Sequence, residues 1–338
     1  MKKNIARIAR KNSTPNHTLC HDWDAKEIEN IHNQPFFSLL HTAHQVHLKY
    51  NGEMTMQLSS LLNIKTGGCP EDCKYCSQSA HYKGKTRLES KKLMEIKAVL
   101  AEAQTAKKNG ADRFCIGAAW RQIPDTKEFD VVLEIIRGVK KLGMEACATL
   151  GMITKEQAQQ LANAGLTAYN HNIDTSPEYY KNVTSTRTFS DRLATLKLVR
   201  EAGIQVCCGG ILGLGETPTD RVEFLKVLAN MNPHPESVPI NVLVPISGTP
   251  FQNNPTVEPL DIVRVVATAR ILMPKSRIRL SAGRKSLSQE AQVLCYFAGV
   301  NSIFYGEKLL TTVNNNKNED IKLFEKLGLS PLNQHSLD

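Results

Sequence analysis

Short apolar runs alternate with longer amphipathic segments from about residue 58 to residue 304. In the longer segments apolar positions recur at helical spacing, which is typical of helices that bury one face. Many of these segments end in glycine, which readily closes a helix in a left-handed conformation. The glycines at these ends are Gly110, Gly143, Gly165, Gly203 and Gly299. The pattern therefore predicts strands and helices in alternation along most of the chain.

The short runs predict eight strands: Ser60–Lys65, Asp112–Gly117, Met144–Leu150, Ala168–Asn172, Ile204–Leu212, Ser237–Leu243, Arg277–Ser281 and Ser302–Phe304. The amphipathic segments predict seven helices between them: Ser90–Asn109, Phe129–Leu142, Lys155–Ala164, Asp191–Ala202, Thr219–Met231, Pro259–Leu272 and Ser286–Ala298. Strands that alternate with helices favour a parallel sheet. Eight such units favour a closed (β/α)8 TIM-type barrel, although strand number alone leaves a doubly wound open sheet as the alternative.

The barrel is predicted to span residues 58–310. Residues 1–57 are interpreted as a basic arm and a helical extension, with helices near Trp23–Asn33 and Phe37–Leu48. Residues 311–338 are interpreted as a short C-terminal tail with helical character near Asp320–Leu327. The fold class expected is thus α/β, with the barrel as its main domain.

Charge and composition narrow the class of protein. The chain has 338 residues, is 41% hydrophobic and carries a net charge of +9. Five positive charges fall within the first 11 residues, at Lys2, Lys3, Arg7, Arg10 and Lys11. We interpret this arm as a solvated tail rather than a nucleic-acid or targeting arm, and expect no nucleic-acid partner. No run of 18 apolar residues occurs, so no membrane association is expected.

Nine cysteines are present, and no secretion signal is recognised. The odd count predicts a reducing, cytoplasmic location with thiols used for metal binding. Three of them form a Cys-x3-Cys-x2-Cys loop directly after the first predicted strand, at Cys69, Cys73 and Cys76. Three thiolates can hold three irons of a four-iron cluster and leave the fourth iron open. The alternatives are a zinc site completed by His81 and thiols of unrelated use.

A second group of residues lies on separate predicted strands: Cys115, Cys147, Cys207 and Arg279. Side chains alternate along a strand, so single residues from four strands can converge on a barrel axis. A buried cysteine can also serve as a small hydrophobe. Three of them below a first cysteine loop favour a second metal site, such as a two-iron cluster. The alternative role of Arg279 is a salt bridge across the barrel.

Polar residues follow the fourth predicted strand. Asn170, Asn172 and Asp174 occupy alternate positions and can therefore share one face. Amides suit a ureido group or a ribose, although such residues also form turns and helix caps. Arg192 can bind a carboxylate as a fork or form a surface ion pair. The glycine-rich run 209–215 allows close approach of a ligand but lacks the spacing of a dinucleotide fingerprint.

Several segments resemble the biotin synthases, a family of radical S-adenosylmethionine enzymes. They are Gly67–Ser79, Arg113–Trp120, Glu145–Gly151, Tyr169–Ser176, Val206–Glu216, Arg279–Arg284 and Asn301–Gly306. The likeness extends over about residues 35–330. It implies a sulfurtransferase that inserts sulfur into dethiobiotin, the last step of biotin biosynthesis. A radical formed from S-adenosylmethionine would remove hydrogen from dethiobiotin, and the carbon would then take sulfur from a two-iron cluster.

The resemblance also implies roles for individual residues. The implied iron ligands are Cys69, Cys73 and Cys76 for a 4Fe-4S cluster, and Cys115, Cys147, Cys207 and Arg279 for a 2Fe-2S cluster. The residues implied to contact S-adenosylmethionine are Tyr75, Asn172, Asp174, Arg192 and Ile211, and those implied to hold dethiobiotin are Asn170 and Asn241. Cys208 stands where the family often has a small polar residue, and the motif favours Cys207 as the ligand. A homodimer and a reduced flavodoxin- or ferredoxin-type electron donor are further expectations.

Rival interpretations come from other classes of protein. A lipoyl synthase or a hydrogenase-maturation protein would use the same scaffold, but the second cysteine triplet of a lipoyl synthase is missing. A ferredoxin-like electron carrier needs a fourth cysteine near the triplet, and a zinc-stabilised binding module needs only zinc. Iron and sulfide analysis separates these classes, since two clusters contain about six irons per chain.

Overall fold

The computed structural model describes residues 19–52, 55–306, 309, 312 and 314–332 of the chain. The basic arm at residues 2–11 lies outside the described residues. The strands are β1 (Thr55–Lys65), β2 (Arg113–Ala118), β3 (Glu145–Thr149), β4 (Ala168–Asn170), β5 (Gln205–Cys207), β6 (Gly210–Leu212), β7 (Ser237–Val242), β8 (Arg277–Leu280), β9 (Ser302–Phe304) and β10 (Ser330–Pro331).

The helices are α2 (Ala25–His32), α3 (Phe36–Asn51), α4 (Ile96–Lys108), α5 (Lys127–Lys141), α6 (Lys155–Asn163), α7 (Phe189–Glu201), α8 (Pro218–Ala229), α9 (Pro259–Leu272), α10 (Gln289–Phe297) and α11 (Lys317–Leu327). The short 3-10 helices in the described part of the chain are η1 (Ala80–Tyr82), η2 (Tyr180–Asn182) and η3 (Arg284–Ser286). Most predicted elements therefore exist, with their ends shifted by a few residues.

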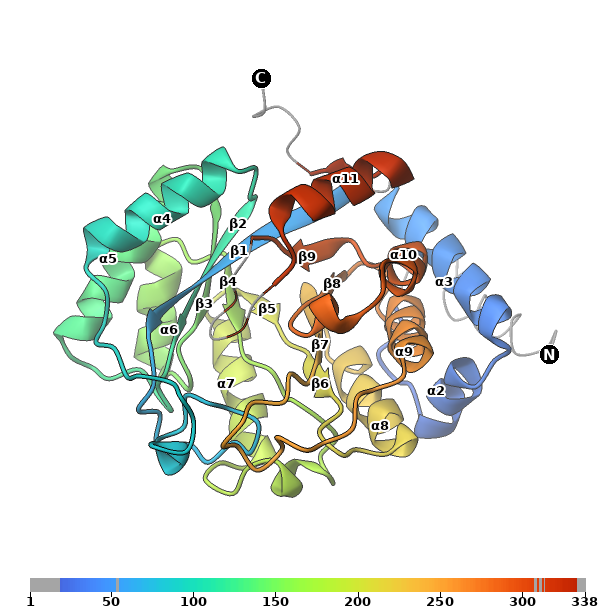
Figure 1. Cartoon of the computed structure of the whole chain (residues 1–338), viewed down its shortest axis with the longest axis horizontal. Helices are drawn as coiled ribbons and strands as arrows, with labels where there is room; N and C mark the ends of the chain where they lie inside the picture. Colours follow the sequence, from blue (N-terminus) through green and yellow to red (C-terminus); the bar gives the residue numbers. More distant parts are fainter. Residues whose placement is uncertain (1–18, 53–54, 307–308, 310–311, 313, 333–338) are drawn as a thin grey trace.

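The strands close into a parallel barrel. Their order is β1-β2-β3-β4-β5-β7-β8-β9, and β9 pairs with β1 to complete the circle. Helices surround this barrel on its outside (Figure 1). The closed arrangement confirms the predicted (β/α)8 TIM-type fold and excludes the open sheet, because an open sheet would leave β1 and β9 as unpaired edges.

The fifth predicted strand, Ile204–Leu212, differs from expectation because it forms two short strands. β5 pairs with β4 and touches β7 at Cys207, whereas β6 pairs with β7 alone. The chain bends at Cys208 and Gly209 between them. A side chain on Gly209 would place its Cβ 1.9 Å from the carbonyl oxygen of Pro239. Glycine is therefore required where this strand shifts against β7.

Local chemistry sets the ends of the helices. Thr188 begins α7 with a capping box. The Thr188 hydroxyl accepts from the Asp191 N–H, and the Asp191 carboxylate accepts from the Thr188 N–H. Each of the five glycines predicted at helix ends has a positive φ, between 76° and 109°. This confirms the left-handed terminations expected from the sequence.

The segments outside the barrel pack on its flank. In the described residues, α2 packs against α8 and α9, and α3 packs along α9. β10 adds to β1, which begins at Thr55 and so reaches into the predicted extension. α11 is held by a buried ion pair between Arg284 and Asp320 at 2.5 Å. The division of the chain at residues 57 and 310 stays a prediction.

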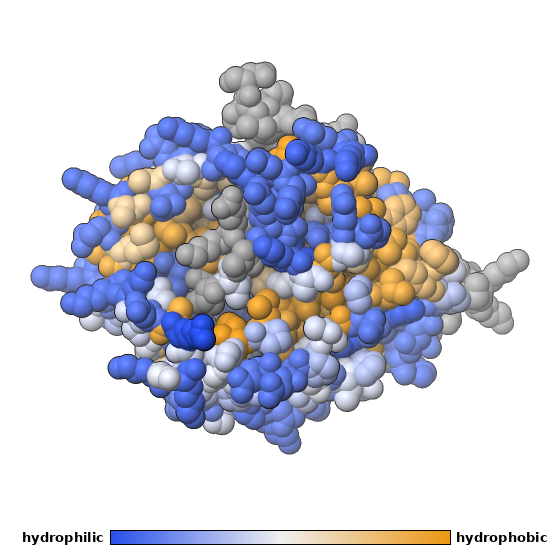
Figure 2. Space-filling model, in the orientation of Figure 1, coloured by the Kyte–Doolittle hydropathy of each residue, from blue (hydrophilic) through white to orange (hydrophobic). Residues whose placement is uncertain are grey.

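The face of the molecule seen in Figure 2 is mainly hydrophilic. Hydrophilic residues cover most of the outline of the face in Figure 2, and hydrophobic residues gather towards its middle and right. Among the described residues, no helix has the length and apolar character needed to cross a membrane.

Candidate active site

A cavity of about 330 Å³ opens at the carboxyl ends of the barrel strands. In TIM-type barrels this end carries the active site because the βα loops meet there. The cavity is lined by every site residue singled out from the sequence except Cys207. Residues more than 200 positions apart, such as Cys69 and Arg279, therefore share one space.

The cysteine loop after β1 forms one wall of this cavity. Its ends are tied together, because the Cys69 N–H donates to the Gln78 carbonyl at 3.0 Å and the Cys69 carbonyl accepts from Ala80 at 2.7 Å. Burial raises the pKa of Cys73 to about 11 and that of Cys76 to about 12. Both thiols are thus protonated near neutral pH in the metal-free protein, and metal binding must release protons.

In the described part of the chain, no three His, Cys, Asp or Glu side chains are arranged to hold one ion. A four-iron cluster does not require that arrangement, since each thiolate binds a separate iron. Soft thiolates on one cavity wall are donors that suit such a cluster.

Three further thiols lie deeper in the barrel. Cys115 on β2 and Cys147 on β3 are direct neighbours in register, and Cys207 ends β5. The Cys147 thiol is hydrogen-bonded to both others. These contacts confirm that the three cysteines converge, as strand alternation predicted. The hydrogen bond with Cys115 raises the pKa of Cys147 to about 12.

Arg279 reaches the same thiols from β8. Its Nε donates to the Ser302 hydroxyl at 2.9 Å and one terminal nitrogen donates to Gln57 at 3.2 Å. The other terminal nitrogen lies 3.9 Å from the sulfur of Cys207. No carboxylate among the described residues pairs with Arg279, so the side chain does not form the salt bridge that the sequence left open.

Sequence reasoning missed Arg113, which lies beside this group. It is 2% exposed and pairs with Glu145 at 2.7 Å, while its Nη1 has no partner among the described residues. Burial opposes its charge, but the neighbouring Cys147 and Glu145 raise the pKa of Arg113. Arg113 stands two positions before Cys115, so strand alternation could have placed both on one face. Two buried guanidinium groups, one with a free N–H, fit a group of thiolates that carry negative charge.

Polar residues occupy the middle of the cavity wall. Asp174 pairs with Arg192 at 2.5 Å, and both are buried. The Tyr75 hydroxyl donates to the same carboxylate oxygen at 3.3 Å, and Arg192 also donates to the Tyr180 hydroxyl at 2.8 Å. Arg192 is therefore a cavity residue and not a member of a surface pair.

Asp174 has an unusual backbone. With φ at 66°, it is the one non-glycine residue of the described chain in the left-handed region. Its N–H donates to the Gly209 carbonyl at 3.3 Å, and its carbonyl accepts from Ile211 at 2.8 Å. A left-handed aspartate costs on the order of 1 kcal/mol, which the bonds to the β5–β6 bend offset. The bend in the fifth strand thus positions this carboxylate.

The remaining predicted contacts are arranged as neighbours. Asn170 donates to the Asn172 side-chain oxygen at 3.1 Å and to the sulfur of Cys207 at 3.3 Å. Ile211 and Asn241 are register partners on β6 and β7. The Asn241 amide is already engaged by backbone, since it donates to Gly210 at 2.9 Å and accepts from Ala282 at 3.2 Å.

Comparison with known protein families places the chain in the radical SAM superfamily. Residues 63–228 match the model of the radical SAM superfamily, and residues 239–330 match that of the biotin and thiamin synthesis associated domain. Two solved structures share the fold. The methylornithine synthase is 17% identical, with a TM-score of 0.77 over 92% of this chain and 95% of its own. The FeFe-hydrogenase maturase of Carboxydothermus hydrogenoformans is 19% identical, with a TM-score of 0.80 over 98% and 79%.

Curated relatives identify the family. The biotin synthase of Methylorubrum populi is 60% identical over 91% of this chain and 90% of its own length. That of Prochlorococcus marinus is 57% identical over 91% of each chain. The chain belongs to the biotin synthase family.

Proposed function

We propose that this chain forms biotin by inserting sulfur into dethiobiotin, with S-adenosylmethionine as the source of the radical. The observation that carries the proposal is the arrangement of two groups of thiols on one cavity. One group lies in the loop at the mouth, and the other lies deep between β2, β3 and β5. Polar side chains suited to a zwitterionic ligand stand between them.

The residues present fit two iron–sulfur clusters. Cys69, Cys73 and Cys76 would hold the 4Fe-4S cluster. The ligands that would hold the 2Fe-2S cluster are Cys115, Cys147, Cys207 and Arg279. When bound, the first cluster supplies the electron that cleaves S-adenosylmethionine, and the second supplies the sulfur atom. The unpaired Nη1 of Arg113 supports the second assignment, because a buried donor without a partner suits an acceptor such as sulfide.

The protein's own side chains would bind and orient the two organic molecules. Asp174 and Arg192 would contact S-adenosylmethionine as a fixed pair of opposite charges, with Asn172 beside them. Tyr75 and Ile211 would flank its adenine. Because Asn170 touches Cys207, a dethiobiotin held there would lie next to the deep thiols.

Water exclusion would follow from the apolar part of the lining. Leu61 and Phe304 pack against the pair Cys115 and Cys147 at the bottom of the cavity. A closed apolar floor would protect a reactive radical from side reactions. The engaged amide of Asn241 would leave only its remaining N–H to contact the substrate.

An electron carrier would approach near the cysteine loop. Residues 83–92 follow it and expose Lys83, Lys85, Arg87, Lys91 and Lys92 against the single acidic residue Glu89. This local excess of positive charge supports an acidic flavodoxin- or ferredoxin-type donor. The homodimer and the cytoplasmic location stay predictions.

The test is an anaerobic assay of deoxyadenosine and biotin from dethiobiotin, together with iron and sulfide analysis. The reconstituted protein should hold about six irons per chain. Cys147→Ala should still cleave S-adenosylmethionine but lose at least about a hundredfold of its biotin yield, since each cofactor carries a separate step.

Cys208→Ala is the matched control, because Cys208 is equally buried but belongs to the outer hydrophobic core. Its biotin yield should stay within about twofold of the unmodified protein, because its side chain packs in the hydrophobic core and does not line the cavity. Full biotin formation by Cys147→Ala would remove the sulfur-donor assignment. A protein that binds zinc alone would refute the proposed function.

A further inference from the structure

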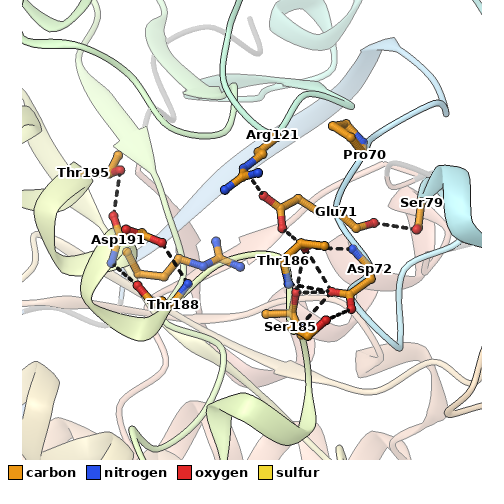
Figure 3. A network of polar contacts seen from close by, with 12 residues as sticks. Pro70, Glu71, Asp72, Ser79, Arg121, Ser185, Thr186, Thr188, Asp191 and Thr195 are labelled. Atoms are coloured by element: carbon orange, nitrogen blue, oxygen red, sulfur yellow. Dashed lines mark hydrogen bonds and ion pairs between the residues drawn. The ribbon is translucent and has the colours of Figure 1, made fainter.

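Two carboxylates stand inside the cysteine loop, between Cys69 and Cys73. They are Glu71 and Asp72, and neither is one of the three cysteine ligands of the motif. Figure 3 shows both carboxylates directed towards Ser185 and Thr186, in the segment 184–186 that lies between η2 and α7. This segment is more than 110 residues away along the chain.

Asp72 is an acceptor for three consecutive residues. Its carboxylate accepts from the hydroxyls of Thr184 at 2.6 Å, Ser185 at 2.5 Å and Thr186 at 3.0 Å. It also accepts from the backbone N–H groups of Ser185 at 2.9 Å and Thr186 at 3.2 Å. In return the Asp72 N–H donates to the Thr186 hydroxyl at 3.1 Å. Asp72 thus joins the cysteine loop to the segment 184–186 by hydrogen bonds in both directions.

Glu71 extends the connection to a third loop. It is 3% exposed, shares the single Thr186 hydroxyl proton with Asp72 and forms an ion pair with Arg121 at 3.1 Å. Arg121 follows β2, so the loops after β1, β2 and β4 meet here. The backbone of the cysteine loop is held as well, because Ser79 donates to the Glu71 carbonyl at 2.5 Å and Tyr82 to the Asp72 carbonyl at 2.6 Å.

The segment on the other side leads directly to the charged pair of the cavity. Thr188 caps α7 two residues after Thr186, and Arg192 lies in the first turns of that helix. The Lys74 N–H donates to the Val183 carbonyl at 2.9 Å and adds a backbone contact to the same junction. Any displacement of residues 184–186 would therefore move Arg192 relative to the cysteine loop.

We propose that Asp72 is a positioning residue that holds the cysteine loop in alignment with the Arg192–Asp174 pair. The proposal rests on the proposed function, in which the loop and the pair bind opposite parts of one S-adenosylmethionine molecule. Two half-sites on separate loops bind one ligand well only when their spacing is held before binding. Asp72 performs this by hydrogen bonds, since it touches neither a thiol nor the pair in the described contacts.

The experiment compares Asp72→Ala with Asp72→Asn. Alanine removes every acceptor, whereas asparagine keeps the oxygen that receives four of the five bonds, and its amide can donate to the Ser185 hydroxyl. The dissociation constant of S-adenosylmethionine is measured on anaerobically reconstituted protein. We expect this dissociation constant to rise about tenfold in Asp72→Ala and to stay within about threefold in Asp72→Asn. A small misalignment weakens the binding of a ligand that must contact both the loop and the Arg192–Asp174 pair. Asp130→Asn, an exposed carboxylate on α5, is the matched control.

Two further readouts separate positioning from general damage. Hydrogen exchange of the metal-free protein should increase in residues 69–82 and 184–188 of Asp72→Ala, with no change in β7 and β8. The electron paramagnetic resonance signal of the reduced cluster should still change when S-adenosylmethionine is added, but only at about tenfold higher concentration.

An unchanged dissociation constant in Asp72→Ala, with cluster content equal to the unmodified protein, would overturn the proposal. Equal loss in the alanine and asparagine variants would also overturn it, since charge rather than alignment would then be the cause. Failure of the unmodified protein to bind iron or S-adenosylmethionine would instead refute the proposed function.

Discussion

The buried pair of Arg192 and Asp174 offers a sharp test of how this cavity is built. The perturbation is Arg192→Met, which keeps most of the side-chain volume but removes the charge. The side chains of Arg192 and Asp174 are 7% and 2% exposed, and the pair is 2.5 Å apart. Removal of one partner leaves the Asp174 carboxylate buried with only the long hydrogen bond from Tyr75 at 3.3 Å. Breaking a buried pair in this way costs about 3–5 kcal/mol of stability.

The second variant of the cycle is Asp174→Asn, and the third combines both changes. Asparagine suits the positive φ of 66° at this position and is neutral, so the double variant buries no charge. We expect the free energy of unfolding of the double variant to be within about 1–2 kcal/mol of that of the unmodified protein. Replacing both ions destabilises the fold much less than leaving one buried ion without its partner. The coupling free energy between the two sites should therefore exceed about 2 kcal/mol.

The assay is urea unfolding of the metal-free protein under reducing conditions at pH 7.5, with the folded fraction monitored by circular dichroism. Metal-free protein is used so that loss of a cluster does not enter the free energy of unfolding. A loss below about 1 kcal/mol for Arg192→Met would refute the reasoning, since the pair would then be effectively solvated. Single effects that add to within about 0.5 kcal/mol in the double variant would refute it as well.

Three other predictions follow from the structure. Gly209→Ala should cost about 2–4 kcal/mol of stability in a urea titration, because the added Cβ would meet the Pro239 carbonyl. Gly203→Ala, whose added Cβ has no atom within 4 Å, should cost about 1 kcal/mol. Equal losses in the two variants would contradict this. Burial lowers the pKa of His32 and of His47 to about 4, so the unfolded state takes up protons below pH 6.5 that the folded state does not. Stability should be complete above pH 6.5 and fall towards pH 4, by about 1.4 kcal/mol per histidine at pH 5.5, and a flat profile between pH 7.5 and 5.5 would exclude this. Mass spectrometry of metal-free protein at pH 8 should show iodoacetamide alkylation of Cys76 at least about a hundredfold slower than of a small thiol.

The elements and the kind of chemistry could be predicted from local sequence. Helical spacing of apolar residues, with glycine at the ends, located α5, α6 and α9 because a helix selects its buried face within each turn. The spacing of the cysteine loop likewise indicates its ligand chemistry, since three thiols within a span of eight residues stay close together in the fold. These features depend only on neighbours along the chain.

Other features depend on how eight strands are placed against one another. The break of the fifth strand at Gly209 arises because its two halves pair with different strands. β5 pairs with β4, whereas β6 pairs with β7. The left-handed Asp174 depends on that bend, and the unpaired nitrogen of Arg113 depends on which thiols its strand faces. The contact between Asp72 and residues 184–186 joins two loops that no local pattern relates.

The amino-acid sequence by itself determined the alternation of strands and helices that favours a parallel barrel, and the spacing of the cysteine loop, because periodicity and short spacing are properties of neighbouring residues. Only the tertiary structure decided that the two groups share one cavity with Arg192 and Asp174, and that Asp72 ties their loops together. Those decisions require barrel closure, which brings the carboxyl ends of strands from residue 65 to residue 304 to a single opening. Closure is a collective result of all the strand pairings, so no single segment of the sequence contains it.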